Sequence, residues 1–144
     1  MEDLEYNFEA VRDKMLKILE NDKYTQYLGI EIIDYEEKFI RARMPVRDEL
    51  VNNFGSLHGG VLYSFADIVA GTVSCTCGTF SPTVEGHLNY LEPAISKEYV
   101  YCEAKRVRCG SHLCVVKIKI KNDEGKLLDD GSFTFYRTGS AVVK

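Results

Sequence analysis

The chain has 144 residues, of which 45% are apolar and 28% are charged, and its formal net charge is −4. This length and balance predict one soluble globular domain, spanning residues 1–144, with a sizeable core. The acidic balance argues against nucleic acid or anionic lipid as a partner. The opening MEDLEYNFEA lacks a basic segment followed by an apolar one, and no apolar run reaches membrane-spanning length. We therefore expect a cytoplasmic protein without a secretory signal or membrane segment.

The cysteines give no pattern that is typical of a cross-linked or metal-binding domain. Their number is odd, and no pair has the C-x-x-C spacing. We therefore expect no disulfide framework and no metal site, and thiols that pack as small apolar groups in a reducing compartment. The five are Cys75, Cys77, Cys102, Cys109 and Cys114.

The N-terminal segment has apolar residues at spacings of three and four, with charged residues between them. This periodicity predicts an amphipathic helix over residues 1–22, packed on the domain or on a partner subunit. The Asn21-Asp22 pair marks its end. The apolar positions are Leu4, Phe8, Val11, Met15, Ile18 and Leu19.

Two short β-strands are predicted next, in residues 28–36 and 38–46, with the turn at residues 36–38. In the second strand apolar and charged residues alternate, which indicates a sheet with one buried face. Pro45 suits the end of such a strand.

Residues 52–77, NNFGSLHGGVLYSFADIVAGTVSCTC, begin as a polar loop and become almost continuously apolar after Gly60. A run that is apolar on every side predicts a helix that is buried all round. Asp67 is its single formal charge. A buried carboxylate needs a partner or a use, so Asp67 is a candidate functional residue. The alternative is a carboxylate that is hydrogen-bonded for structural reasons.

The rest of the chain predicts four more strands, in residues 83–91, 98–109, 112–122 and 127–137. Turn signals separate them at residues 109–111 and 122–125. One long apolar helix among about six strands is best buried if an antiparallel sheet curls around it. The predicted fold is therefore α+β, a hotdog architecture with an extra N-terminal helix.

With this element order, the motifs NNFGSLHGGVLYSFAD and TVEGHLNYLEPA resemble those of the hotdog-fold acyl-CoA thioesterases of the phenylacetate-degradation (PaaI-type) group. Members of that group have an Asn, then G-x-x-H-G-G, then a helix that carries an Asp. The similarity covers residues 27–138, the predicted hotdog core. It implies hydrolysis of an aliphatic or aromatic acyl-CoA to a free acid and CoA, without a cofactor or metal.

The resemblance also implies roles for particular residues. Asp67 would be the nucleophile or general base, and the Gly59 N–H would polarise the thioester carbonyl. Asn52 would position substrate or water, Thr83 would hold the attacking water, and His58 would have an accessory role. Residues at three places in the sequence would contact CoA, although His112 could instead be a plain turn residue. They are Gly60, Tyr90, Arg108, Gly110, Ser111, His112 and Leu113.

A spacing argument adds a prediction about assembly. Gly59 and Asp67 are eight residues apart, which is ~12 Å along a helix, so one carbonyl cannot touch both groups of one chain. We therefore predict a homodimer with shared active sites, in which Gly59 and Asn52 of one subunit meet Asp67 and Thr83 of the other. Relatives in the group commonly pair such dimers into tetramers, which implies a dimer of dimers here.

Two other functions remain open at the level of sequence. A non-catalytic acyl-CoA-binding sensor would use the same pocket, but sensors of this kind usually carry a DNA-binding domain, which is not evident in this short acidic chain. A hotdog dehydratase or hydratase would use a His with an acidic partner. The His58-Gly59-Gly60 triplet with Asp67 nine residues after His58 is not that signature.

Overall fold

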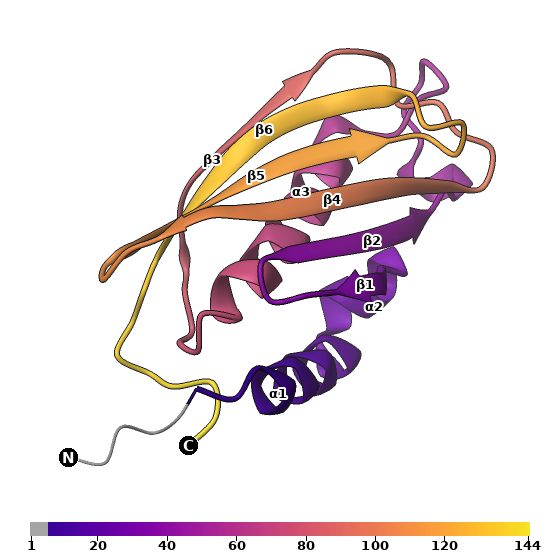
Figure 1. Cartoon of the computed structure of the whole chain (residues 1–144). Helices are drawn as coiled ribbons and strands as arrows, with labels where there is room; N and C mark the ends of the chain where they lie inside the picture. The colour runs from indigo at the N-terminus through magenta and orange to yellow at the C-terminus, as the bar shows by residue number, and fades with distance from the viewer. Residues whose placement is uncertain (1–5) are drawn as a thin grey trace.

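The structure, a computed structural model, describes residues 6–144, and these form one sheet and its covering helices (Figure 1). The long helices and the six strands are of the type that the sequence periodicity predicted. In chain order they are α1 (Phe8–Asn21), α2 (Lys23–Leu28), β1 (Glu31–Tyr35), β2 (Phe39–Pro45), the 3-10 helix η1 (Asp48–Leu50), α3 (Gly59–Cys75), β3 (Thr83–Tyr90), β4 (Tyr99–Cys109), β5 (Leu113–Lys121) and β6 (Leu127–Tyr136).

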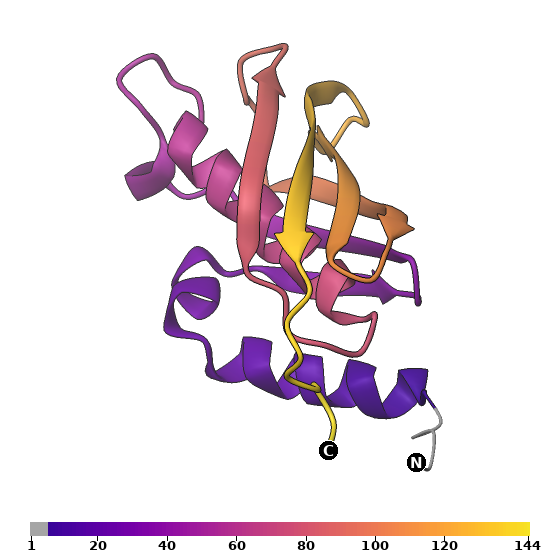
Figure 2. The same cartoon turned by 90° about the vertical axis from the view of Figure 1, so that its left-hand side faces the viewer.

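The six strands form one antiparallel sheet in the order β1-β2-β4-β5-β6-β3. The sheet curls around α3, as the two perpendicular views show (Figures 1 and 2). Its two edges are β1 and β3, so the strand that follows α3 in sequence is far from β2 in the sheet. The predicted α+β architecture, with one long helix inside a curled sheet, is confirmed.

The core lies between the concave face of the sheet and α3. The predicted alternation in β2 is confirmed, since Ile40, Ala42 and Met44 have no exposed surface. In β5 the apolar residues likewise face α3, while Lys117 and Lys119 point to solvent. Burial of such side chains contributes roughly 1.5–3 kcal/mol each, which fixes the register of every strand against the helix.

α3 differs from the prediction because it is not buried on all sides. Phe65, Val69 and Val73 have no exposed surface, since they face the sheet. The opposite flank borders the β3 edge and is only half-buried in the single chain, including Tyr63 and Asp67. The prediction of a fully buried Asp67 is therefore wrong for the single chain, because one curled sheet covers only one side of the helix.

The N-terminal region also differs from the prediction. α1 ends at Asn21, as expected, but Leu4 lies outside the described residues. A second helix, α2, lies between the predicted helix and the predicted first strand, and it includes Leu28, where we expected that strand to begin. Asp22 caps it by accepting the Thr25 N–H at 3.0 Å, and Gly29 ends it with φ 74°. The first strand consequently begins at Glu31.

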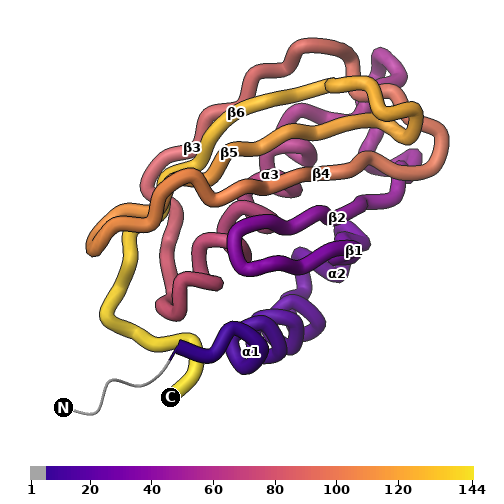
Figure 3. Tube along the Cα trace, viewed as in Figure 1, coloured from indigo at the N-terminus to yellow at the C-terminus, as the bar shows by residue number. Residues whose placement is uncertain are grey.

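The N-terminal helix packs beside the C-terminal segment, and the tube view shows the two lying together (Figure 3). Val11 and Met15 of α1 form a small second core with Cys75 and Val142. None of the helices in residues 6–144 combines the length and apolar character needed to cross a membrane.

The prediction of free cysteines is wrong for one pair. Cys77 and Cys109 form a disulfide, whereas Cys75, Cys102 and Cys114 are free and buried. The two bonded residues are 32 positions apart in the sequence. Their spacing carries no signal, because the fold alone brings the end of α3 beside the end of β4.

Candidate active site

The N-terminus of α3 presents free backbone donors. His58 occupies the N-cap position without a side-chain cap, and its carbonyl accepts from Val61 and Leu62. The N–H groups of Gly59 and Gly60 have no acceptor within residues 6–144. Unpaired N–H groups at a helix N-terminus, aligned with the helix dipole, can stabilise a negatively charged oxygen.

The loop before α3 is organised by Asn52. Its Oδ1 accepts the N–H groups of Phe54 and Ser56 at 2.8 and 3.2 Å, and its Nδ2 donates to Ser56 Oγ at 3.1 Å. Gly55, with φ 84°, allows the tight turn inside this loop. Asn52 therefore shapes the loop in the single chain, and its contact with substrate or water stays a prediction.

A pocket of about 370 Å³ opens at this end of the helix. The hydroxyl of Tyr90, at the end of β3, donates to the Gly59 carbonyl at 2.7 Å. A Cβ on Gly59 would lie 3.2 Å from the Tyr90 ring, so a larger residue here would displace the ring by a few tenths of an ångström. The pocket is lined by Asn52, Ser56, Leu57, Gly59, Leu62, Tyr90, Leu91, Glu92, Pro93 and Ala94.

Asp67 lies outside that pocket, two turns further along α3. Thr83, the first residue of β3, donates from Oγ1 to Asp67 Oδ1 at 2.7 Å. Asp67 is half-buried and Thr83 is exposed, so the pair lies at the surface beside the free edge of the sheet. The structure thus separates two groups of predicted residues, Asn52 with Gly59 and Tyr90, and Asp67 with Thr83.

The residues predicted to contact CoA are divided in the same way. Tyr90 lines the pocket and Gly60 follows the lining residue Gly59, whereas residues 108–113 form the end of β4 and its turn into β5. In this turn Ser111 Oγ lies 2.9 Å from His112 Nδ1, and Arg137 donates to the Gly110 carbonyl at 2.8 Å. Arg108, Ser111, His112 and Leu113 are exposed.

The strand register shows how far apart these groups are. Thr83 is paired through β6 and β5 to Cys109, beside the β4–β5 turn, whereas Tyr90 is paired through Asp129 to the other end of the sheet. Seven residues of extended strand separate Thr83 from Tyr90, which is ~24 Å. One chain therefore does not bring the predicted site together.

Asp129 is a titratable group that the sequence analysis missed. It is fully buried, and neither carboxylate oxygen has a hydrogen-bond partner within residues 6–144. Burial, aided by the neighbouring Asp130, raises the pKa of Asp129 to about 7. Its place in the core could have been found from parity, since it lies an even number of residues before the inward-facing Phe133 and Phe135.

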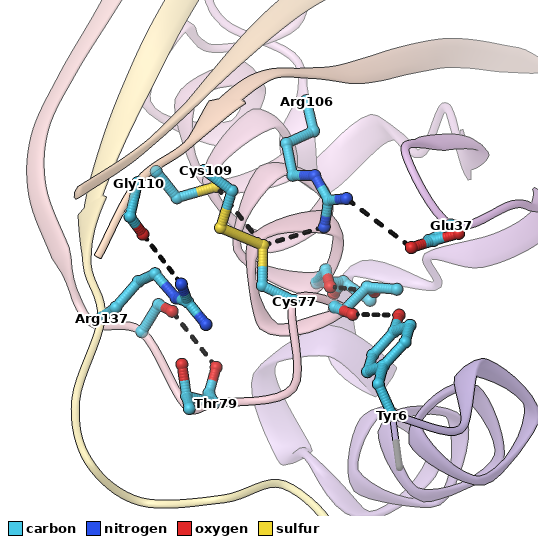
Figure 4. The surroundings of a disulfide bond; sticks show 12 residues. Tyr6, Glu37, Cys77, Thr79, Arg106, Cys109, Gly110 and Arg137 are labelled. Carbon is cyan, nitrogen blue, oxygen red and sulfur yellow. Dashed lines mark hydrogen bonds and ion pairs between the residues drawn. A yellow bond between two sulfur atoms is a disulfide. The ribbon is translucent and has the colours of Figure 1, made fainter. Parts of the chain in front are cut away.

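One group of side chains has the composition of a metal site. The sulfur atoms of Cys77, Cys109 and Cys114 lie within 4.8 Å of one another, and in residues 6–144 no other set of three His, Cys, Asp or Glu side chains is as close. This cluster is beyond the C-terminal end of α3, whereas the Gly59 pocket is at the N-terminal end of the same helix. Figure 4 shows the surroundings of Cys77 and Cys109. None of these three cysteines is among the residues predicted to bind or hydrolyse the thioester.

Comparison with known proteins identifies the family of the chain. Residues 54–128, which contain α3 and most of the sheet, match the thioesterase superfamily. A putative esterase from Archaeoglobus fulgidus is 30% identical over 129 residues, which cover 90% of this chain and 82% of the relative. The acyl-coenzyme A thioesterase PaaI from Escherichia coli is 29% identical over 124 residues, 86% of this chain and 89% of that protein.

Solved structures show the same architecture. The E. coli PaaI protein superposes with a TM-score of 0.87 at 25% identity, covering 92% of this chain and 96% of that one. A hypothetical thioesterase from Streptococcus pneumoniae, solved with coenzyme A, has the same fold with a TM-score of 0.74 at 23% identity, covering 94% and 99%. The chain therefore belongs to the thioesterase superfamily and has its hotdog fold, as the sequence motifs indicated.

Proposed function

We propose that this protein hydrolyses an acyl-CoA thioester to a free acid and CoA. The observation that carries the proposal is the pair of free N–H donors at Gly59 and Gly60, of which Gly59 lines a pocket, on the same helix as the Asp67 carboxylate. The similarity to the E. coli acyl-coenzyme A thioesterase PaaI supports this reaction class. No cofactor is needed, because water and a carboxylate suffice for the chemistry.

The reaction places negative charge on the former carbonyl oxygen of the thioester. The Gly59 N–H would donate to that oxygen, and removal of one such donor typically costs about 10²–10³ in rate. Asp67 would attack the carbonyl carbon directly or remove a proton from the attacking water, with Thr83 holding its carboxylate in place. The sulfur would leave as the CoA thiolate.

The site is proposed to form between two subunits. Gly59 and Asp67 of one chain are ~12 Å apart along α3, too far to act on one carbonyl. The β3 edge of the sheet is free in the single chain, and Val84, the second residue of β3, is 60% exposed. Antiparallel pairing of two β3 edges about a twofold axis would extend the sheet and satisfy these unpaired backbone groups.

Such pairing of two β3 edges would bring the two separated groups of site residues together. It would place the Tyr90 end of one β3 beside the Thr83 end of the other, because antiparallel strands run in opposite directions. The Gly59 pocket of one subunit would then face Asp67 and the β4–β5 turn of its partner. All residues predicted to bind CoA or to act on the thioester would meet in each of two equivalent sites. Two such dimers would then form the tetramer.

Measuring the loss of thioester absorbance over a panel of aliphatic and aromatic acyl-CoAs tests the activity. We expect turnover by the wild type and a fall in kcat of at least ~100-fold in Asp67→Asn, the range expected when a general base is lost. The matched control is Asp34→Asn, because Asp34 is an exposed carboxylate on β1. Binding of the panel without any turnover would refute hydrolysis and favour the sensor function.

A further inference from the structure

Three cysteines gather where the C-terminal end of α3 meets the β4–β5 hairpin, and Figure 4 shows two of them, Cys77 and Cys109, joined by a disulfide. Cys77, two residues past α3, is bonded to Cys109, the last residue of β4. Cys114 is the cross-strand partner of Cys109, and its Sγ lies 4.0 Å from Cys77 Sγ. A free thiol therefore lies beside the disulfide, in contact with one of its sulfur atoms.

Arg106 provides a positive charge at Cys77. Its Nη1 donates to Cys77 Sγ at 2.8 Å, and only 10% of its side chain is exposed. Glu37 lies 4.0 Å from the same guanidinium but is half exposed, so solvent screens its opposing charge. A neighbouring guanidinium stabilises a thiolate, which is the nucleophile and also the leaving group in thiol–disulfide exchange.

The bonded sulfurs are accessible from solvent, whereas the third is not. Cys77 and Cys109 line a cavity of about 210 Å³ together with Tyr6, Glu37, Arg106 and Arg137. Cys114 has no exposed surface and does not line it. Burial raises the pKa of the Cys114 thiol. Cys77 and Cys109 can therefore react with a molecule from solvent, whereas Cys114 cannot.

We propose that Cys77 is a redox modification site, which reacts with low-molecular-weight disulfides and is resolved by Cys109. The Cys77 thiolate attacks one sulfur of a disulfide RSSR, which gives a mixed disulfide at Cys77 and releases RS⁻. The Cys109 thiolate then attacks Cys77 Sγ, which forms the Cys77–Cys109 bond and releases the second RS⁻. The two protein thiols lose two electrons and two protons, and RSSR is reduced to two RSH. A low-molecular-weight thiol reverses both steps.

The same sulfurs could in principle bind a soft metal ion, since thiolate ligands suit zinc. The electrostatic surroundings favour exchange instead. Arg106 contacts the cluster directly, and Arg137 lies on its other side, where it donates to Gly110. Two fixed positive charges beside the sulfurs lower their affinity for a cation and raise their reactivity as thiolates.

Formation of the Cys77–Cys109 disulfide would restrict the β4–β5 hairpin, which begins next to Cys109. Residues 110–113 connect Cys109 to Cys114 and contain four of the positions predicted to contact CoA. The disulfide fixes the base of this hairpin to the segment after α3. We expect oxidation to change KM for acyl-CoA while kcat changes less, because Asp67 and Gly59 lie on other parts of the chain. This consequence, unlike the modification site itself, depends on the proposed function.

Trapping the mixed disulfide tests the modification site without any activity measurement. The fully reduced wild type should titrate five thiols and the protein treated with glutathione disulfide three. The Cys109→Ser Cys114→Ser variant lacks both resolving sulfurs, so it should retain one glutathione, located at Cys77 by peptide mass spectrometry. Cys109→Ser alone should form the Cys77–Cys114 bond, because these sulfurs are already 4.0 Å apart.

Two controls separate charge and position from general reactivity. Cys75→Ser removes a buried free thiol close in sequence and should leave both the bond and the thiol titration difference in place. Arg106→Met should slow formation of the adduct at Cys77 by about three- to tenfold at pH 7, whereas Arg106→Lys should retain most of the rate. An adduct at Cys109 or Cys75 in place of Cys77, or no adduct at excess glutathione disulfide, would refute the proposal.

The reduced protein also decides between exchange and metal binding. The reduced protein is incubated with zinc and then dialysed against a chelator. If the wild type keeps one zinc ion per chain and Cys114→Ser keeps none, the exchange proposal is overturned. For the functional consequence, KM is compared between reduced and oxidised wild type by thioester absorbance, with Cys77→Ser as the variant that cannot respond. Equal KM values would refute the link to CoA binding alone. Absence of turnover in both states would refute the proposed function and leave the modification site standing.

Discussion

The hydroxyl of Thr83 donates a hydrogen bond to the Asp67 carboxylate at 2.7 Å, which connects the edge strand β3 to the half-exposed flank of α3. The two residues are 16 positions apart in sequence. Because a hydrogen bond to a charged group contributes about 1.5–3 kcal/mol, it can hold the carboxylate in one orientation. This contact joins the predicted base to the strand that we place at the dimer interface.

Replacing Thr83 tests that contact. Thr83→Val keeps the shape of the side chain and removes the donor, so we expect kcat to fall about tenfold, equivalent to about 1.4 kcal/mol. Thr83→Ser keeps the hydroxyl and should retain most of the activity. Thr83 is exposed, so neither variant should change the melting temperature by more than a degree or two. Equal kcat values in the two variants would show that the hydroxyl has no role in the reaction.

Gly59 allows the oxyanion donor to be removed cleanly. It is the first residue of α3, and His58 before it has φ −56° and ψ 137°, a conformation that accepts a following proline. Gly59→Pro removes the N–H, and we expect kcat to fall about 10²–10³-fold. Gly59→Ala introduces a Cβ against the Tyr90 ring but keeps the N–H, so it measures the steric part of the effect. Similar losses in both variants would mean that crowding at Tyr90, and not the donor, is responsible.

Mixed dimers test whether sites are shared. Subunits with Asp67→Ala and subunits with Gly59→Pro are each expected to be inactive alone. In a random mixture, half of the dimers are heterodimers with one intact site each, so about a quarter of the wild-type activity should return. If each site instead uses Gly59 and Asp67 of one chain, every site lacks one group and no activity returns.

Asn52 should affect stability and activity in separable ways. Asn52→Ala removes the acceptor for the Phe54 and Ser56 N–H groups, so we expect a loss of about 1–2 kcal/mol in the free energy of unfolding. Asn52→Asp keeps that acceptor and should be nearly as stable as the wild type in urea unfolding. If Asn52→Asp also keeps full activity, the Asn52 amide has no separate role with substrate or water.

Asp129 predicts an unusual dependence of stability on pH. Its pKa is raised from 3.8 to about 7 by burial, so between these values the folded protein holds a proton that the unfolded chain has released. The free energy of unfolding therefore falls as pH rises, by up to about 1.4 kcal/mol per pH unit, and levels off above pH 7. The difference in stability between pH 6 and pH 8, from urea midpoints, should shrink in Asp129→Asn. As a control, replacement of the exposed Asp34 in Asp34→Asn should leave this difference in stability unchanged. If Asp129→Asn shows the same difference as the wild type, Asp129 does not titrate between pH 6 and pH 8.

Much of the architecture followed from the sequence because local periodicity reports burial. The alternation in β2 and β5 placed their inward residues correctly, and the apolar run after Gly60 identified the central helix. Turn residues marked the strand ends to within one or two positions in the second half of the chain. α2 was missed because its six residues are too few to show a helical period, and its cap at Asp22 was interpreted as the end of α1.

Sequence patterns alone identified the helix that carries both Gly59 and Asp67, and the motif that relates this chain to the thioesterase superfamily. Their separation along that helix follows from helical geometry alone. By contrast, three contacts are visible only in the folded chain: Thr83 with Asp67, Tyr90 with Gly59, and Cys77 with Cys109. These contacts join residues 16 to 32 positions apart, and they depend on how the sheet curls around α3, which no local pattern specifies.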